Sequence, residues 1–193
     1  MIAEMRAPAP NIRDYTDYVR EFLHLSENAL RAGQALKAAY YLRSAEFYML
    51  PDDPRKPSAR GEFVCLTPEY FGVAPKRTTG FPTVGRRPPA IGSPIPFRAA
   101  PSCCLAASNS YVEELFPMQA HPLDAGFNVI SFDGPGQDAA LEDEHLAMTP
   151  DREKPVSPVL DYFHLNNVTL IGYLSGGCLA MRYLRDAATN GAS

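Results

Sequence analysis

Apolar residues recur every three or four positions across residues 12–50 of this 193-residue chain. This spacing places them on one face of an α-helix and so predicts helical structure. Gly33 interrupts the pattern and predicts a break between two helices, because glycine readily adopts the left-handed backbone that ends a helix. The second helix must end in residues 51–54, which read Pro-Asp-Asp-Pro. A further short helix is predicted over residues 61–71.

Two interpretations of the helical stretch are open. Its small and aromatic residues have the spacing of a tetratricopeptide helix pair. The residues concerned are Gly33, Ala38, Tyr41 and Ala45. Such pairs need about three or more stacked copies to bury their faces, and no second copy is visible. We therefore favour a packed helical cap, and keep as the alternative a non-catalytic interaction protein that docks a partner through Tyr40, Tyr41 and Phe47.

The pattern changes abruptly over residues 73–109. Seven prolines and three glycines fall within residues 73–102. Proline lacks the N–H donor that a sheet needs and is confined to strand edges, so no central strand is expected there. We expect a Pro/Gly-rich linker or degenerate strands.

Short apolar runs alternate with helical patterns beyond residue 110. Residues 111–119 and 156–164 predict helices, while residues 127–132 and 168–171 predict strands. Strands alternating with helices in this order imply parallel strands joined by crossover connections. Residues 133–137, which follow the first of these strands, predict a tight turn rather than a phosphate loop, because the lysine of a phosphate loop is missing.

The pattern as a whole predicts an α/β fold in three parts. Residues 1–72 form an N-terminal helical cap region, and residues 73–109 form the linker or degenerate strands. Residues 110–193 form a partial core built on a parallel sheet.

Residues 168–184 carry the strongest candidate chemistry. A short β-branched run enters a glycine-rich turn, and an apolar-periodic helix leaves it. Many serine hydrolases mount their nucleophile in this setting, on a G-x-S-x-G turn whose sharp bend exposes the hydroxyl. Gly172 and Gly176 occupy the two glycine places here. The residue midway between them is Leu174, and the serine follows one position later as Ser175.

Two registers of this turn are conceivable. With Ser175 at the centre, Tyr173 and Gly177 would take the glycine places, and the phenol ring would clash where strand and helix approach closely. With Leu174 at the centre, the leucine adopts a left-handed backbone at a cost of about 1–2 kcal/mol. We favour the second register, with Ser175 in a supporting position. The predicted site consists of Ser175 as the catalytic candidate and of Gly172, Leu174, Gly176 and Gly177 as the elbow.

Three segments together resemble the α/β-hydrolase superfamily, namely residues 110–118, 125–137 and 168–183. The resemblance is to the group that includes 2,6-dihydropseudooxynicotine hydrolase, fungal polyketide-shortening hydrolases and FrsA-like esterases. It implies a serine that attacks an ester or a C–C bond next to a ketone, followed in the chain by an acid and a histidine base. It also implies a small-molecule carbonyl or ester substrate and a homodimer, with no metal and no organic cofactor.

The other members of such a triad are missing from the residues after Ser175. No histidine follows it, and the one acid that does, Asp186, lies in the helix leaving the turn, where it cannot orient a histidine. The four histidines upstream fit surface or structural roles better than a catalytic one. The expected oxyanion loop, residues 104–109, carries alanines where the resembled family has glycines. We therefore expect a truncated and catalytically impaired copy.

Bulk composition argues against several classes of partner. The net charge is −4, the sequence pI is near 5.6, and basic residues do not cluster, so binding to nucleic acid or to an anionic membrane is not expected. No apolar run approaches the ~18 residues of a membrane span, and the start of the chain lacks a signal-peptide core. Four cysteines show no metal-binding spacing, which favours reduced thiols in a cytoplasmic protein.

Overall fold

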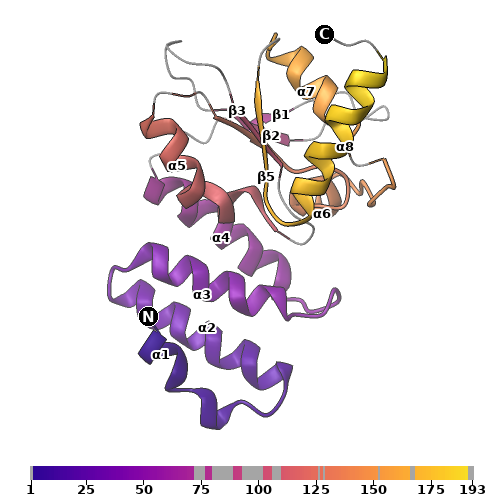
Figure 1. The fold of residues 1–193 in the computed structure, drawn as a ribbon. Helices are drawn as coiled ribbons and strands as arrows, with labels where there is room; N and C mark the ends of the chain where they lie inside the picture. Colours follow the sequence, from indigo (N-terminus) through magenta and orange to yellow (C-terminus); the bar gives the residue numbers. More distant parts are fainter. Residues whose placement is uncertain are drawn as a thin grey trace. The chain divides into compact units, whose positions relative to one another are not determined.

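The chain divides into two compact units, Met1–Ala74 and Pro75–Ser193. The first unit is helical and the second contains a sheet (Figure 1). The computed structural model describes residues 2–71, 77–79, 89–92, 102–105, 110–125, 127, 129–151, 153–165 and 168–190.

The first unit follows the helical periodicity of its sequence. Its elements are α1 (Ile2–Arg6), the 3₁₀ helix η1 (Ala9–Asn11), α2 (Tyr15–Arg31), α3 (Ala35–Phe47) and α4 (Lys56–Phe71). Two long helices separated at Gly33 were predicted, and this is confirmed, since Gly33 has a φ of +69°. The third helix begins at Lys56, earlier than predicted. Its second residue is Pro57, which is tolerated in a first turn because the N–H it lacks would have no helical partner there.

Helix α3 packs against α2 on one side and α4 on the other. Its alanines Ala38, Ala39 and Ala45 are fully buried, and such small side chains allow close approach of the neighbouring helices. Ser26 of α2 is also buried, and its hydroxyl donates a hydrogen bond to the carbonyl oxygen of Ala38 at 2.9 Å. Tyr41 is only 2% exposed, so the alternative prediction that it docks a partner is wrong. The reason is that α3 has neighbours on two sides, which its sequence periodicity alone did not reveal.

A buried ion-pair cluster links α3 to the start of α4. The carboxylate of Glu46, which is 1% exposed, accepts from the Arg43 guanidinium at 2.5 Å. It also pairs with the Lys56 ammonium at 2.8 Å. Two cations around one enclosed carboxylate compensate for the loss of its hydration.

The second unit contains strands and helices in alternation. Its elements are β1 (Arg77–Thr79), β2 (Pro89–Gly92), β3 (Ser102–Leu105), the 3₁₀ helix η2 (Val112–Leu115), α5 (Phe116–Asp124), β4 (Val129–Phe132), α6 (Asp138–Glu142), α7 (Val156–Tyr162), β5 (Thr169–Gly172) and α8 (Ser175–Asn190). The described strands form one sheet in the order β1-β2-β4-β3-β5. Strands β4, β3 and β5 are parallel, as the predicted α/β core requires. Strands β1 and β2 extend the sheet with antiparallel pairing, which was not anticipated.

The proline-rich stretch contributes three short strands to this sheet. The expectation that no central strand fits among its prolines is wrong for β2, which lies between β1 and β4. Pro89 is the first residue of β2, a position where a missing donor is tolerated. The predicted helix over residues 111–119 is divided into η2 and α5. Pro117 stands in the first turn of α5, where proline is also accepted.

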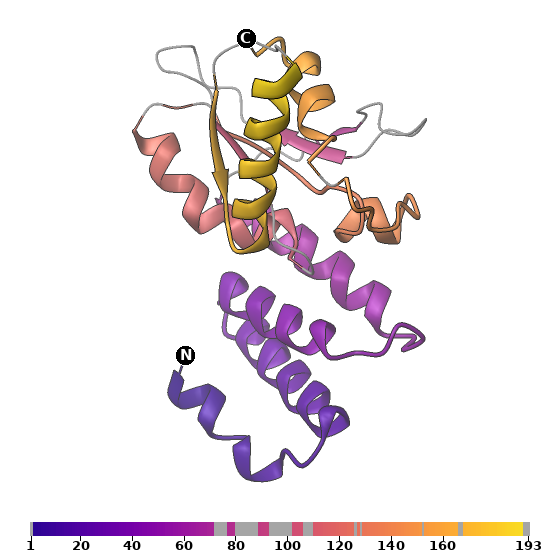
Figure 2. The same ribbon diagram turned by 45° about the vertical axis from the view of Figure 1, so that its right-hand side comes forward.

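Helices cover both faces of the sheet, with α5 on one side and α7 and α8 on the other (Figures 1 and 2). The main apolar cluster joins β4 to α7 and α8. Its buried members are Ile130, Phe132, Val156, Val159, Leu160, Leu179 and Ala180. All four residues of β4 are buried, whereas those of β5 range from half-buried to exposed. Within the described residues, no helix has the length and apolar character needed to cross a membrane.

Candidate functional site

The turn between β5 and α8 is a sharp strand-to-helix bend. Only Tyr173 and Leu174 separate the end of the strand from the start of the helix. The Gly176 N–H donates to the Tyr173 carbonyl at 2.8 Å, and the Gly177 N–H donates to the Leu174 carbonyl at 3.1 Å. These two bonds close the first turn of α8 immediately after the strand.

The backbone places the centre of this bend at Leu174. Its φ is +53°, so the left-handed conformation predicted for Leu174 is confirmed. A Cβ atom on Gly172 would collide with the carbonyl of Gly176 and would lie 2.5 Å from the nitrogen of Gly177. Strand and helix therefore approach each other at the two places where the sequence has Gly172 and Gly176. This is the register in which Ser175 stands one residue after the apex.

The side chain at the apex is exposed and apolar. Leu174 is 88% exposed, the largest exposure among the exposed large hydrophobic residues described in the structure. Ser175 is also exposed and is the first residue of α8. Gly176 is buried and Gly177 half-buried. The five predicted site residues thus lie in one turn, but its apex, Leu174, carries no hydroxyl.

The first N–H groups of α8 form the polar part of this turn. A helix N-terminus has N–H groups without helical acceptors, together with the positive end of the helix dipole. In the resembled fold the residue after the apex supplies one oxyanion N–H, and in this chain that residue is Ser175. The second donor was predicted in residues 104–109, of which Cys104 and Leu105 belong to β3 and residues 106–109 lie outside the described part.

The parallel strands end at one edge of the sheet. Leu105 of β3 pairs with Gly172 of β5 and with Phe132 of β4. The residues that follow these strands therefore emerge together at the carboxyl edge, where open α/β sheets bind their ligands. This alignment brings the residues after β4 to the same edge as the elbow.

The turn after β4 is tight, as predicted, and it is also buried. The Gly134 N–H donates to the side-chain oxygen of Gln137 at 2.9 Å. Gly136 has a φ of +82°, and a Cβ atom added there would lie 2.6 Å from that of Met148. Asp133 and Gln137 are both nearly fully buried. Sequence reasoning identified the turn through its glycines but missed the burial of these polar side chains, which no local pattern signals.

The histidines lie on other elements, and the candidate acid Asp186 lies further along α8. His121 is in the last turn of α5, while His145 and His164 are in connecting segments, each with a φ of +55°. All three are exposed, as is His24 in the first unit. Asp186 accepts from the Arg185 guanidinium at 2.7 Å, and this hydrogen bond raises the pKa of Arg185. Asp186 is therefore engaged within α8, as expected from its position in that helix.

Metal-ligating side chains do not gather in the part of the chain that the structure describes. No group of three histidine, cysteine, aspartate or glutamate residues there could hold a metal ion. Cys65 and Cys178 are free and exposed thiols.

The chain is similar in sequence to three fungal proteins, two named as alpha/beta hydrolases and one as a hydrolyase. The chain is 28% identical over 187 residues to the alpha/beta hydrolase psoB of Aspergillus fumigatus, covering 78% of this chain and 40% of psoB. It is 26% identical to the alpha/beta hydrolase ucsC of an Acremonium species, over 82% of this chain and 39% of ucsC. It is also 26% identical to the hydrolyase poxO of Penicillium oxalicum, over 84% of this chain and 46% of poxO. The chain thus spans less than half the length of these relatives. No protein-family model matches it.

Solved structures share the fold. AbyA5 superposes with a TM-score of 0.73 at 18% identity, covering 94% of this chain and 54% of AbyA5. The 2,6-dihydroxy-pseudo-oxynicotine hydrolase superposes with a TM-score of 0.58 at 22% identity, covering 94% of this chain and 56% of that hydrolase. These comparisons confirm the predicted resemblance and favour the hydrolase interpretation over the tetratricopeptide-like alternative.

Proposed function

We propose, from the partial α/β-hydrolase fold of this chain and its hydrolase relatives, that it derives from a serine hydrolase and is catalytically impaired. The observation that carries the proposal is the elbow, whose backbone has the geometry of a nucleophile turn while its apex residue is Leu174. A leucine has no group that can attack a carbonyl carbon. The backbone needed to present a nucleophile is therefore present without the nucleophile.

The substrate class follows from the resemblance rather than from a pocket. A serine at the apex of such a turn attacks an ester carbonyl, or a ketone whose neighbouring C–C bond then breaks. We extend the proposal to a small carbonyl or ester compound, including a polyketide, and to a cytoplasmic homodimer. Ser175 is the catalytic candidate in this chain, since it is exposed at the N-terminus of α8 and has the only hydroxyl in the 172–177 turn apart from that of Tyr173.

Labelling with a fluorophosphonate probe tests the impairment. This probe reacts with activated serines, so we expect the purified chain to be labelled no faster than its Ser175→Ala variant. Labelling that disappears in Ser175→Ala would show that Ser175 is an active nucleophile despite its position, and would overturn the proposal.

A chimaera tests the descent from a serine hydrolase. The part of psoB that this chain does not span would be joined to it, because the resembled fold places its acid and histidine after the elbow. We expect labelling of the chimaera that carries Leu174→Ser together with Ser175→Leu, because the bend then presents a hydroxyl at its apex. The matched chimaera with the original Leu174 and Ser175 should stay unlabelled. Equal labelling of the two would contradict the assignment of the apex to residue 174.

A further inference from the structure

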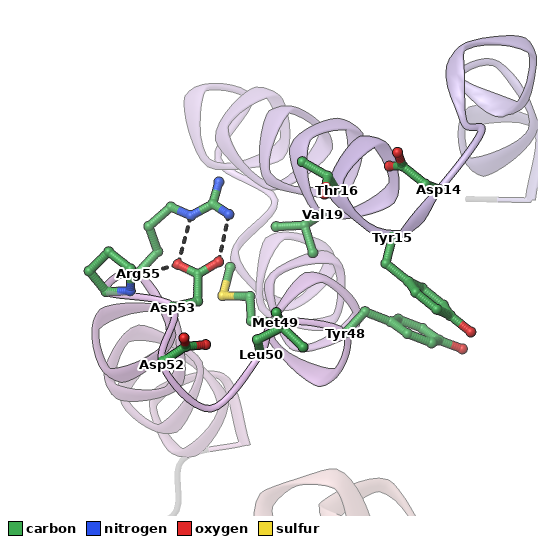
Figure 3. A pocket seen from close by; sticks show the side chains of 11 residues that line it. Asp14, Tyr15, Thr16, Val19, Tyr48, Met49, Leu50, Asp52, Asp53 and Arg55 are labelled. Atoms are coloured by element: carbon green, nitrogen blue, oxygen red, sulfur yellow. Dashed lines mark hydrogen bonds and ion pairs between the residues drawn. The ribbon is translucent and has the colours of Figure 1, made fainter.

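The first unit has a hollow of about 630 Å³ at one end of its helical hairpin (Figure 3). The start of α2 forms one wall, through Asp14, Tyr15 and Val19. The segment that joins α3 to α4 forms the other wall, through Tyr48, Leu50 and Asp52. The hollow lies wholly within the first unit and shares no residue with the elbow.

Exposed aromatic and aliphatic side chains border this hollow. The rings of Tyr15 and Tyr48 stack with their centroids 5.1 Å apart and their planes inclined by 14° (Figure 3). Tyr15 is 69% exposed, Tyr48 is 40% exposed and Leu50 is 70% exposed. Phe47 lies edge-on to Tyr48, also at 5.1 Å, and is 47% exposed. A contiguous apolar patch of this kind marks an interaction site, and tyrosine is enriched at the centres of protein interfaces.

The tyrosine pair is already ordered before any partner binds. Tyr18 also contacts the pair, since its ring lies edge-on to that of Tyr48 with the centroids 4.7 Å apart. The Tyr18 ring in turn stacks on Phe22 at a centroid distance of 4.1 Å. Ordering flexible side chains on binding costs free energy, and stacked rings have already lost much of that freedom. The pair is therefore suited to act as a preformed anchor.

The charge of the hollow is negative. Three carboxylates line it against one guanidinium, a net charge of −2. The guanidinium of Arg55 donates to both carboxylate oxygens of Asp53, at 3.0 and 2.6 Å, and holds the pKa of Asp53 down at about 2. Asp53 and Arg55 thus neutralise each other. The remaining charge belongs to Asp14 and Asp52, which lie on opposite walls (Figure 3).

We propose that this hollow binds a basic amphipathic peptide segment of another protein. An apolar side chain of the segment packs on the Tyr15–Tyr48 pair and Leu50, while its lysine or arginine side chains face Asp14 and Asp52. A peptide fits better than a small molecule, because small-ligand sites enclose most of their ligand, whereas the rings and the aliphatic side chain here are between 40% and 70% exposed. This inference is independent of the catalytic proposal and adds a protein partner to a hydrolase-type chain.

Fluorescence anisotropy with a defined probe tests the proposal. The probe is a short labelled peptide in which arginine and lysine alternate with leucine and phenylalanine, and its control replaces the basic residues with glutamate. We expect binding of the basic peptide only, weakened about tenfold by Tyr15→Ala because an anchor is lost. Asp14 caps α2, since its carboxylate accepts from the Asp17 N–H at 2.8 Å. The Asp14→Asn, Asp52→Asn double variant should also weaken binding and reduce its dependence on salt, since asparagine keeps this cap while removing charge.

Matched variants separate this site from a general attraction to an acidic protein. Tyr70 is 59% exposed on α4, and Glu27 is 63% exposed near the far end of α2. Tyr70→Ala and Glu27→Gln should leave the affinity unchanged, and the far-ultraviolet circular dichroism of every variant should match that of the original chain. In ¹H–¹⁵N spectra, the peptide should shift resonances of residues 14–19 and 48–55.

Three results would overturn the proposal. The first is equal binding of the acidic peptide. The second is an effect of Tyr70→Ala as large as that of Tyr15→Ala. The third is sedimentation evidence that Tyr15→Ala disrupts a dimer of the chain, because a second copy would then be the occupant.

Discussion

Helix α3 of the first unit and the β5–α8 segment of the second differ in how completely their neighbours cover them. Helix α3 has both sides covered, and even the charged side chain of Glu46 is enclosed between cations. Helix α8 leaves Met181 69% exposed and Leu184 53% exposed. Strand β5 has only β3 as a neighbour among the described strands, and none of its residues is buried. A strand paired on one side leaves unpaired backbone groups along the other, so the elbow lies at the open margin of the described sheet.

This difference separates the two candidate sites. The helical unit presents a hollow on a closed scaffold, where packed neighbours fix the anchoring rings. The elbow depends on one close approach between a strand and a helix, and its apex points a leucine into solvent.

The largest effect is expected for Glu46→Gln, which removes the enclosed charge. Arg43 is 7% exposed and would lose its counter-charge, as would Lys56, so unfolding should become easier by about 3–5 kcal/mol. Glu27→Gln is the control, because its ion pair with Arg31 is long and solvated and should change stability by less than about 1 kcal/mol. Urea denaturation followed by helical circular dichroism measures both. Equal changes in the free energy of unfolding for Glu46→Gln and Glu27→Gln would mean that the buried cluster stabilises the fold no more than a surface ion pair.

A smaller loss is expected for Gly172→Ala in the elbow. The added methyl group meets the backbone of residues 176 and 177, which cannot move without opening the bend, and the strain should reach about 1–3 kcal/mol. Gly61→Ala in α4 is the matched substitution, since nothing lies within 4 Å of its Cβ position. It should stabilise the helical unit by about 0.5–1 kcal/mol, because alanine favours a helix interior. An unchanged free energy of unfolding in Gly172→Ala would contradict the close approach of β5 and α8 at this residue.

Backbone strain at the apex should be relieved by Leu174→Gly. Glycine adopts a positive φ freely and Leu174 buries little surface, so we expect a gain of about 1 kcal/mol. Gly33→Ala is the reverse change in the helical unit. This variant should lose about the same free energy of unfolding, because alanine is strained at the Gly33 φ of +69°. No atom lies within 4 Å of the Cβ position, so the loss would come from the backbone alone. The midpoint of thermal unfolding should rise for Leu174→Gly and fall for Gly33→Ala. Shifts in the same direction would contradict the strain assigned to Leu174.

The smallest effect is expected from ionisation of the Tyr41 phenol, which changes the stability of the fold only in alkali. Burial, together with the hydrogen bond from its hydroxyl to Glu4 at 2.8 Å, raises the pKa of Tyr41 to about 12. In the unfolded chain the same phenol ionises near pH 10. Folding therefore favours the neutral phenol, so the free energy of unfolding keeps its full value below about pH 10 and falls as the pH rises toward 12. Urea midpoints measured across this range should fall for the original chain and fall less for Tyr41→Phe. Parallel curves would show that another group controls the alkaline transition.

The sequence by itself determined the helices of the first unit and the register of the elbow. Helical periodicity and a glycine break are local signals, and they correctly predicted helices α2 and α3 and the break between them at Gly33. The steric argument against Tyr173 in a glycine place gave the left-handed Leu174, because the constraint involves residues within one turn.

Only the tertiary structure decided how distant segments are used. Strand β1 pairs with β2, β2 pairs with β4, and β3 pairs with both β4 and β5. This pairing with remote segments overrides the unfavourable composition of a proline-rich stretch. Packing on two sides buried Tyr41, while Tyr15 and Tyr48, which are 33 positions apart in the sequence, were brought into a stack. The physical reason is the same in each case, since burial and pairing depend on neighbours that are remote along the chain.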